Sequence, residues 1–240
     1  PRPVRIAGAQ TVAGFDRQSC GREPTSHCMP VHRASRQRRS LSAVPFGLGC
    51  AVMASPATDT SDPAPRGLPT YHARRGRLSA LSKSRLDTLL PARRLPEGIL
   101  DPRTIFGRSG RLVVEIGAGH GDSAVAYAVT HPECDVVAAE VHRAGMARLL
   151  ASADRFAVPN LRVELGDGVS LLTERFPRGS VSEIHVWFPD PWPKARHAKR
   201  RIIRPGILDL FAERLAPSGV VLLASDHAPF MAYAEDVVDT

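Results

Sequence analysis

The sequence contains few cysteines, and their distribution argues against a disulfide framework. Three of the four lie in the first 50 residues, and Cys134 stands alone. A stable disulfide scaffold is not implied, and a reducing cytoplasm is the simpler setting. Cys28 lies close to His27 and His32, but no second ligand pair follows at finger-like spacing, so we expect no metal site.

Long hydrophobic runs are also missing. Charged residues interrupt the apolar runs within about ten positions, which is too short for a membrane span. A hydrophobic content of 43% in 240 residues is nevertheless enough for a sizeable core. We therefore expect a folded cytoplasmic protein, monomer or homodimer, with no membrane partner.

Positive charge is unevenly distributed along the chain. The net charge of +8 divides into +6 for residues 1 to 50, +4 for residues 51 to 100 and −2 for the remainder. The cationic tract at residues 194 to 204 is therefore a local patch in a slightly acidic half of the chain. Such a patch is typical of a nucleic-acid contact.

The first 70 residues have no sustained periodicity and are rich in Arg, Ser, Pro, Gly and Ala. This composition predicts a disordered extension. The sequence has no initiator Met, and Met53 is a plausible true start, so the residues before it are a candidate for sequence outside the native product. We expect one folded domain over residues 71 to 240.

Leucines spaced three and four residues apart predict a short amphipathic helix over residues 78 to 90, capped by Ser79 or Ser82 and closed by Pro91. From Arg111 onward, strand-like and helix-like runs alternate, which predicts an α/β fold with a mostly parallel sheet and helices on both faces. The expected strands are 111–116, 135–140, 161–166, 183–188 and 219–225. The expected helices are near 121–131, 144–157, 169–175 and 204–215.

A glycine-rich turn follows the first expected strand. Gly117, Gly119 and Gly121 allow a sharp turn and a close approach of a ligand to the backbone, although this spacing alone is a weak signal. The next strand ends in Glu140, about twenty residues on, where a carboxylate can accept hydrogen bonds from ribose hydroxyls. A third strand ends near Asp167, which can accept from an adenine amino group.

Three successive strand ends each carry an acid, namely Glu115, Glu140 and Asp167. These acids help to distinguish between possible cofactors. A dinucleotide brings a pyrophosphate, which favours a helix N-terminus without nearby carboxylates. Glu115 and Asp122 flank the glycine turn instead. They fit S-adenosyl-L-methionine, which carries a sulfonium and an ammonium group and no phosphate.

A proline-stiffened loop follows the fourth strand. Three prolines fix the backbone around Asp190 and Trp192, and a dense run of cations follows directly. We expect Asp190 at a strand tip. The candidate phosphate contacts in the run are Lys194, Arg196, Lys199, Arg200 and Arg201.

The run FPDPWPKARHAKRRI from Phe188 resembles the signature of the bacterial tRNA (guanine-N7-)-methyltransferases, and VVEIGAGHG, AAEVH and LGDG are similar to that family's cofactor motifs. The resemblance covers roughly residues 70 to 240. It implies a class I, Rossmann-like methyltransferase fold and transfer of a methyl group from S-adenosyl-L-methionine to guanine N7 in the variable loop of tRNA.

The resemblance also implies roles for individual residues. It assigns cofactor contacts to Glu115, Glu140, Asp167 and Asp190, with Asp190 also catalytic, and substrate contacts to Lys194 and Asp226. The chain departs from the family at Ala198, where Asn is usual. It also stops at Thr240, before a further Thr and Glu motif and the last two strands of the fold, so we expect a domain that is incomplete at its C-terminus.

Guanine N7 has a free in-plane lone pair and no proton, so methyl transfer requires no general base. Asp190 is therefore assigned to positioning the guanine and stabilising the developing positive charge. The guanine has to leave its tertiary stack, and Trp192 is either its stacking partner or a structural plug under the loop.

Three other functions stay open. Asp190-Pro191-Trp192-Pro193 is loosely similar to the motif of amino-directed nucleic-acid methyltransferases, but it lacks the second consecutive proline. A nucleotide-dependent oxidoreductase is disfavoured because no Tyr is followed four residues later by Lys. A non-catalytic RNA-binding protein would bind tRNA without methyl incorporation.

Overall fold

The computed structural model describes residues 6–7, 70–71 and 76–238. We expected disorder over residues 1 to 70. Except for Ile6, Ala7 and Thr70, these residues lie outside the described part of the chain. Met53, the expected start, and Cys28, considered above as a metal ligand, also lie outside the described residues. Among the described residues, no helix has the length and apolar character needed to cross a membrane.

A parallel sheet organises the domain. Its strands occur in the order β1-β6-β5-β2-β3-β4, and every pair of neighbours is parallel. This confirms the predicted α/β fold. The bounds are β1 (Ile6–Ala7), β2 (Arg111–Ile116), β3 (Cys134–Ala139), β4 (Leu161–Glu164), β5 (Val181–Trp187) and β6 (Leu215–Ala224).

Five of these strands match the predicted ones to within a few residues. The largest difference is at β6, which starts at Leu215 and not at residue 219. Leu215 pairs with Val181, and the next pair joins Val220 to Glu183, so the register shifts between them. The residues between Leu215 and Val220 include Pro217 and Gly219, which explains why the sequence pattern placed the strand start later.

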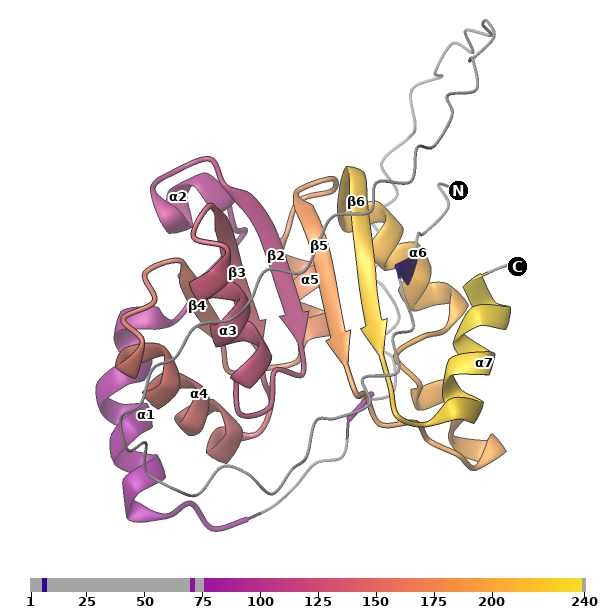
Figure 1. Ribbon diagram of the computed structural model, residues 1–240, viewed down its shortest axis with the longest axis horizontal. Coiled ribbons are helices and arrows are strands. Elements are labelled where there is room, and N and C mark those ends of the chain that lie inside the picture. The colour runs from indigo at the N-terminus through magenta and orange to yellow at the C-terminus, as the bar shows by residue number, and fades with distance from the viewer. Residues whose placement is uncertain (1–5, 8–69, 72–75, 239–240) are drawn as a thin grey trace, which may run out of the picture. The chain divides into compact units, whose positions relative to one another are not determined.

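Helices cover both faces of the sheet (Figure 1). On one face α5, α6 and α7 pack against β2, β5 and β6, and on the other α1, α3 and α4 pack against β2, β3 and β4. The bounds are α1 (Ala80–Arg93), α2 (Pro102–Phe106), α3 (Asp122–Thr130), α4 (Arg143–Arg155), α5 (Gly168–Arg175), the 3-10 segment η1 (Ala195–Arg200), α6 (Pro205–Arg214) and α7 (Ala228–Val238).

The prediction that Pro91 closes the first helix is wrong. Helix α1 begins after Ser79, whose hydroxyl accepts from the Ser82 N–H, and it continues through Pro91 to Arg93. Arg93 donates hydrogen bonds to the carbonyl oxygens of Val158 at 2.6 Å and Ala153 at 3.1 Å. These tertiary contacts hold the last turn against the neighbouring helix and loop, and they outweigh the local effect of the proline.

Candidate functional site

A pocket lies at the carboxyl end of the sheet, where the arrows of β2, β5 and β6 end in Figure 1. Strand order reverses between β2 and β5, which is where open α/β sheets bind their ligands. The pocket has a volume of about 170 Å³ and opens to solvent. Its lining includes Gly117, Glu140, Asp167 and Asp190, which the sequence placed on four different segments.

The glycine turn after β2 is shaped by two separate requirements. Gly117 has a φ of +73° and open space where a Cβ would stand, so its conformation needs glycine while its surroundings leave room for a ligand. Gly121 has a φ of +84°, and a Cβ there would lie 2.4 Å from Cγ of Leu149. Gly121 therefore allows close packing against Leu149 of helix α4. The sequence pattern alone had suggested a turn and a ligand approach at this position.

Glu140 anchors the glycine turn to the end of β3. It is 3% exposed, and its Oε2 accepts from the Gly119 N–H at 2.6 Å while Oε1 accepts from the His142 N–H at 2.6 Å. A carboxylate offers about four lone-pair positions, so these two bonds leave acceptor capacity on the pocket side. Gly119 itself is not part of the pocket lining, and it contributes through this bond to Glu140.

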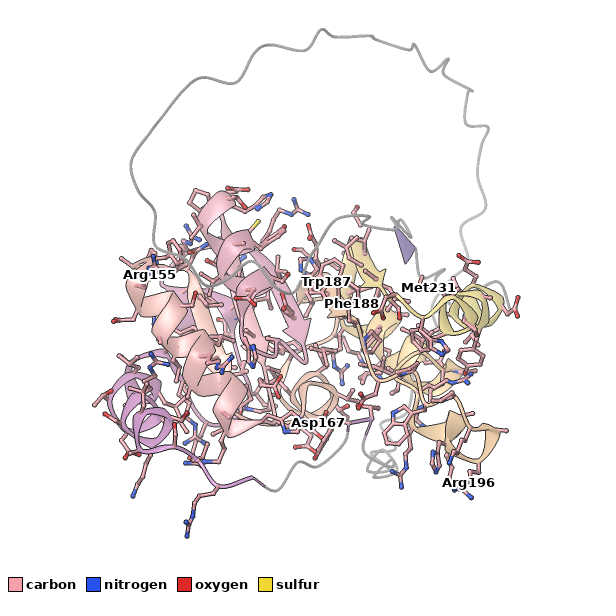
Figure 2. All side chains as sticks on the ribbon, turned by 60° about the horizontal axis from the view of Figure 1, so that its bottom comes forward. Arg155, Asp167, Trp187, Phe188, Arg196 and Met231 are labelled. Carbon is pink, nitrogen blue, oxygen red and sulfur yellow. The ribbon has the colours of Figure 1, made fainter. Side chains whose placement is uncertain are left out.

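Asp167 is the N-cap of α5. Its Oδ1 accepts from the Val169 N–H at 3.3 Å, and its Oδ2 accepts from the Ser170 hydroxyl at 3.1 Å. The cap fixes the carboxylate at the tip of β4, and its remaining lone pairs are available to a donor in the pocket. Figure 2 turns this edge of the sheet toward the viewer and labels Asp167 and Phe188 on it.

Glu115 lies next to the pocket and is not part of its lining. It is 3% exposed, and its Oε2 has no hydrogen-bond partner among the described residues. Burial raises the pKa of Glu115 to about 7, against the opposing effects of the Ser123 hydroxyl and the Trp187 indole. The buried indole Nε1 of Trp187 also has no well-formed hydrogen bond within the described part of the chain, so an acceptor and a donor lie near each other at this point. With its raised pKa, the Glu115 carboxyl is largely neutral below pH 7, and a cation bound nearby would favour its ionised form.

Alternate residues of β5 extend this buried polar region away from the pocket. His185 is the register partner of Glu115, and its Nε2 lies 2.9 Å from Oε2 of Glu183. Glu183 also accepts from the Tyr127 hydroxyl at 3.1 Å and pairs with Arg111 at 2.5 Å. Burial lowers the pKa of His185, which favours its neutral form beside Glu115.

The proline-stiffened loop adopts an uncommon backbone. Phe188 and Trp192 each precede a proline, and their φ angles are +48° and +44°, in the left-handed region. The Phe188 N–H donates to the Ala224 carbonyl at 2.8 Å, which ties the start of the loop to the end of β6. Asp190 lies half-buried between the two aromatic residues and lines the pocket.

Trp192 is packed inside the loop. It is 4% exposed, its Nε1 donates to the Thr70 carbonyl at 3.2 Å, and the Arg200 guanidinium lies 4.9 Å from its ring centroid. Of the two roles weighed for this residue, these contacts favour the structural plug. Trp192 is also absent from the pocket lining.

The cationic tract divides into exposed and structural members. Lys194, Arg196 and Lys199 are exposed and remain candidates for phosphate contacts. Arg201 is half-buried and donates to the carbonyls of Pro191 and Trp192, so its guanidinium holds the loop. Arg200 is likewise half-buried over the Trp192 ring.

The structure places the remaining substrate candidate at the same edge of the sheet but outside the pocket. Asp226 is exposed in the connection between β6 and α7. Sequence reasoning missed Tyr71, Trp187 and Phe188, which all line the pocket. For Phe188 the available signal was its position directly before the proline loop; nothing in the sequence indicated that Tyr71 would reach this pocket.

The chain is similar in sequence to known methyltransferases. A family model described as "Putative methyltransferase" matches residues 109–240. The tRNA (guanine-N(7)-)-methyltransferase of Mycolicibacterium gilvum is 41% identical over 80% of this chain and 79% of its own length. The enzyme of the same name from Halorhodospira halophila is 42% identical over 73% of this chain and 76% of its own. Among solved structures, the 16S rRNA methyltransferase KamB is 19% identical with a TM-score of 0.40, over 53% of this chain and 59% of that chain.

Proposed function

Because the chain belongs to the tRNA (guanine-N(7)-)-methyltransferase family, we propose that it methylates N7 of a guanine in tRNA with S-adenosyl-L-methionine as the methyl donor. One structural observation carries the proposal: a single pocket is lined by Glu140 and Asp167, which suit a nucleoside, and by Asp190 of the proline-stiffened loop. The variable loop of tRNA is the proposed location of the guanine.

The strand order supports a proposed placement of the donor in the pocket. Asp167 follows β4 and would accept from the adenine amino group, and Glu140 follows β3 and would accept from the ribose hydroxyls. The sulfonium end would then lie over β2 and β5, close to Gly117. The Glu115 carboxyl directly precedes Ile116 and Gly117 of the pocket lining and would ionise beside a cation, which supports a cationic group at this end.

The donor supplies an electrophilic methyl carbon, and the sulfur keeps the electron pair of the bond that breaks. Guanine N7 provides the electron pair of the new bond, and the positive charge passes from sulfur to the purine. No proton has to be removed. Asp190 holds the guanine in line with the methyl group and stabilises the charge as it arrives on the ring.

The exposed cations Lys194, Arg196 and Lys199 would bind tRNA phosphates beside the pocket. Arg200 and Arg201 support them by holding the loop. Asp226 would contact the substrate from the neighbouring strand end. We further propose that the protein works in the cytoplasm as a monomer or homodimer.

The proposal is tested by incubating the protein with unmodified tRNA and S-adenosyl-L-methionine labelled on the methyl group. We expect label in 7-methylguanosine, identified after nuclease digestion, and strand cleavage after borohydride and aniline treatment. A tRNA with adenine at the target position is the matched control. Label in an amino-methylated base would identify an amino-directed enzyme, and tRNA binding without incorporation would identify a non-catalytic RNA-binding protein.

A further inference from the structure

Phe188 stands out because neither its backbone nor its packing explains an aromatic residue. Its φ of +48° lies in a region that favours glycine, and its side chain is 54% exposed. Trp192 has a similar φ of +44°, but it is 4% exposed and hydrogen-bonded. Burial therefore compensates the strained conformation of Trp192, whereas no comparable burial compensates that of Phe188.

Strained, exposed residues that persist in a rigid turn are typical of ligand contacts. The turn at Phe188 is fixed on both sides, by the hydrogen bond from its N–H to Ala224 and by the ring of Pro189. Phe188 also lines the pocket together with Asp190. We propose that the Phe188 ring is the stacking surface for the guanine that receives the methyl group. This inference rests on the proposed function.

The strand order indicates which ring system Phe188 can reach. The pocket residues follow β5, β2, β3 and β4 in spatial order, with Phe188 at the β5 end and Asp167 at the β4 end. Neighbouring strands are about 4.8 Å apart, so three steps separate these residues by about 14 Å. An adenine held at Asp167 is too far from Phe188 to stack on it, whereas a base beside Asp190 is close to it.

The two residues have complementary tasks in this arrangement. A base stacked on the Phe188 ring has its plane fixed but remains free to rotate in that plane. Asp190 meets the base at its edge and fixes the rotation, so that N7 points toward the methyl donor. The prolines between and around them keep the ring and the carboxylate in a constant relation.

The test compares Phe188→Gly with the wild-type chain. Glycine relieves the left-handed φ and removes the ring, so we expect thermal unfolding at or above the wild-type temperature. Loss of one base–aromatic stack should lower kcat/KM for tRNA methylation by roughly 5- to 150-fold. Affinity for S-adenosyl-L-methionine, measured by calorimetry without tRNA, should stay within about twofold because the ring does not contact the donor.

Two further variants sharpen the comparison. Phe188→Trp keeps a flat aromatic surface and should retain activity within about threefold of wild type. Phe156→Ala is the matched control, because Phe156 is 55% exposed and follows Arg155, which Figure 2 shows well away from Phe188. It should leave methylation unchanged.

Wild-type rates in Phe188→Gly, or a loss of donor affinity as large as the loss of methylation, would overturn the stacking role. If the wild-type chain methylates tRNA, either result refutes only the stacking role of Phe188 and leaves the proposed function intact. If the wild-type chain transfers no methyl group to tRNA, the proposed function fails, and the stacking role fails with it.

Discussion

Binding of the methyl donor should release a proton from Glu115. The pKa of this buried carboxyl is raised to about 7 by burial, so roughly nine tenths of it is protonated at pH 6. A sulfonium or ammonium group beside it favours the ionised form. The other groups that face it are His185, whose pKa burial lowers, and the uncharged Ser123 and Trp187.

The magnitude follows from the ionised fraction. Between pH 6 and pH 7 that fraction rises from about a tenth to about a half. The affinity for S-adenosyl-L-methionine should therefore rise several-fold when the donor binds the ionised form alone. Measurements should stay below about pH 7.5, because the donor's own α-amino group titrates close to pH 8. Calorimetry in two buffers of different ionisation enthalpy at pH 6 should detect the release of roughly one proton per donor bound.

The variant Glu115→Gln keeps the shape and removes the titration. We expect it to bind the donor more weakly, with almost no proton release and no rise in affinity between pH 6 and pH 7. The reasoning is refuted if the wild-type protein releases no proton, or if the variant releases as much as the wild type.

The same group links stability to pH in the ligand-free protein. Its folded pKa lies above its ordinary value of 4.5, so the folded state holds more protons between pH 4.5 and pH 7. The contribution to stability is therefore complete below pH 4.5 and is lost as the pH rises through 7. It amounts to about 3 kcal/mol, and Glu115→Gln should remove this part of the pH dependence in urea unfolding.

Three other predictions concern the loop and the glycine turn. Asp190→Ala should lower methylation by about 100-fold or more while donor binding persists in calorimetry; wild-type turnover would contradict its role. Lys194→Ala should weaken tRNA binding and reduce the slope of log affinity against log salt by about one, whereas Lys83→Ala on α1 should change neither. Gly121→Ala adds a clash with Leu149 to a φ of +84° and should lower the free energy of unfolding in urea by about 3 kcal/mol. The control Gly179→Ala, where a Cβ would have open space, should lower it by about 1 kcal/mol, and equal losses would contradict the packing role of Gly121.

The sequence predicted the fold well because strong local patterns and the overall fold agree. Buried runs such as that of β2 alternate with amphipathic runs such as that of α4, and parallel strands joined by helices bring their carboxyl ends to one edge. The sequence pointed to Glu140 and Asp167 for this reason, since Glu140 directly follows β3 and Asp167 lies between the end of β4 and the start of α5. Pro91 shows the opposite case, because the tertiary contacts of Arg93 extend the helix past a residue that locally ends one.

By itself, the sequence determined the parallel sheet, the edge that carries the pocket and the acids that surround it, because strand ends and glycine spacing are local properties of the chain. Only the tertiary structure decided between residues of like chemistry within one loop. It buried Trp192 and left Phe188 exposed, and it tied Arg201 to the backbone while Lys194 stayed in solvent. The choice depends on which side of the turn faces the domain, and that is set by contacts with distant segments such as Thr70 and Ala224.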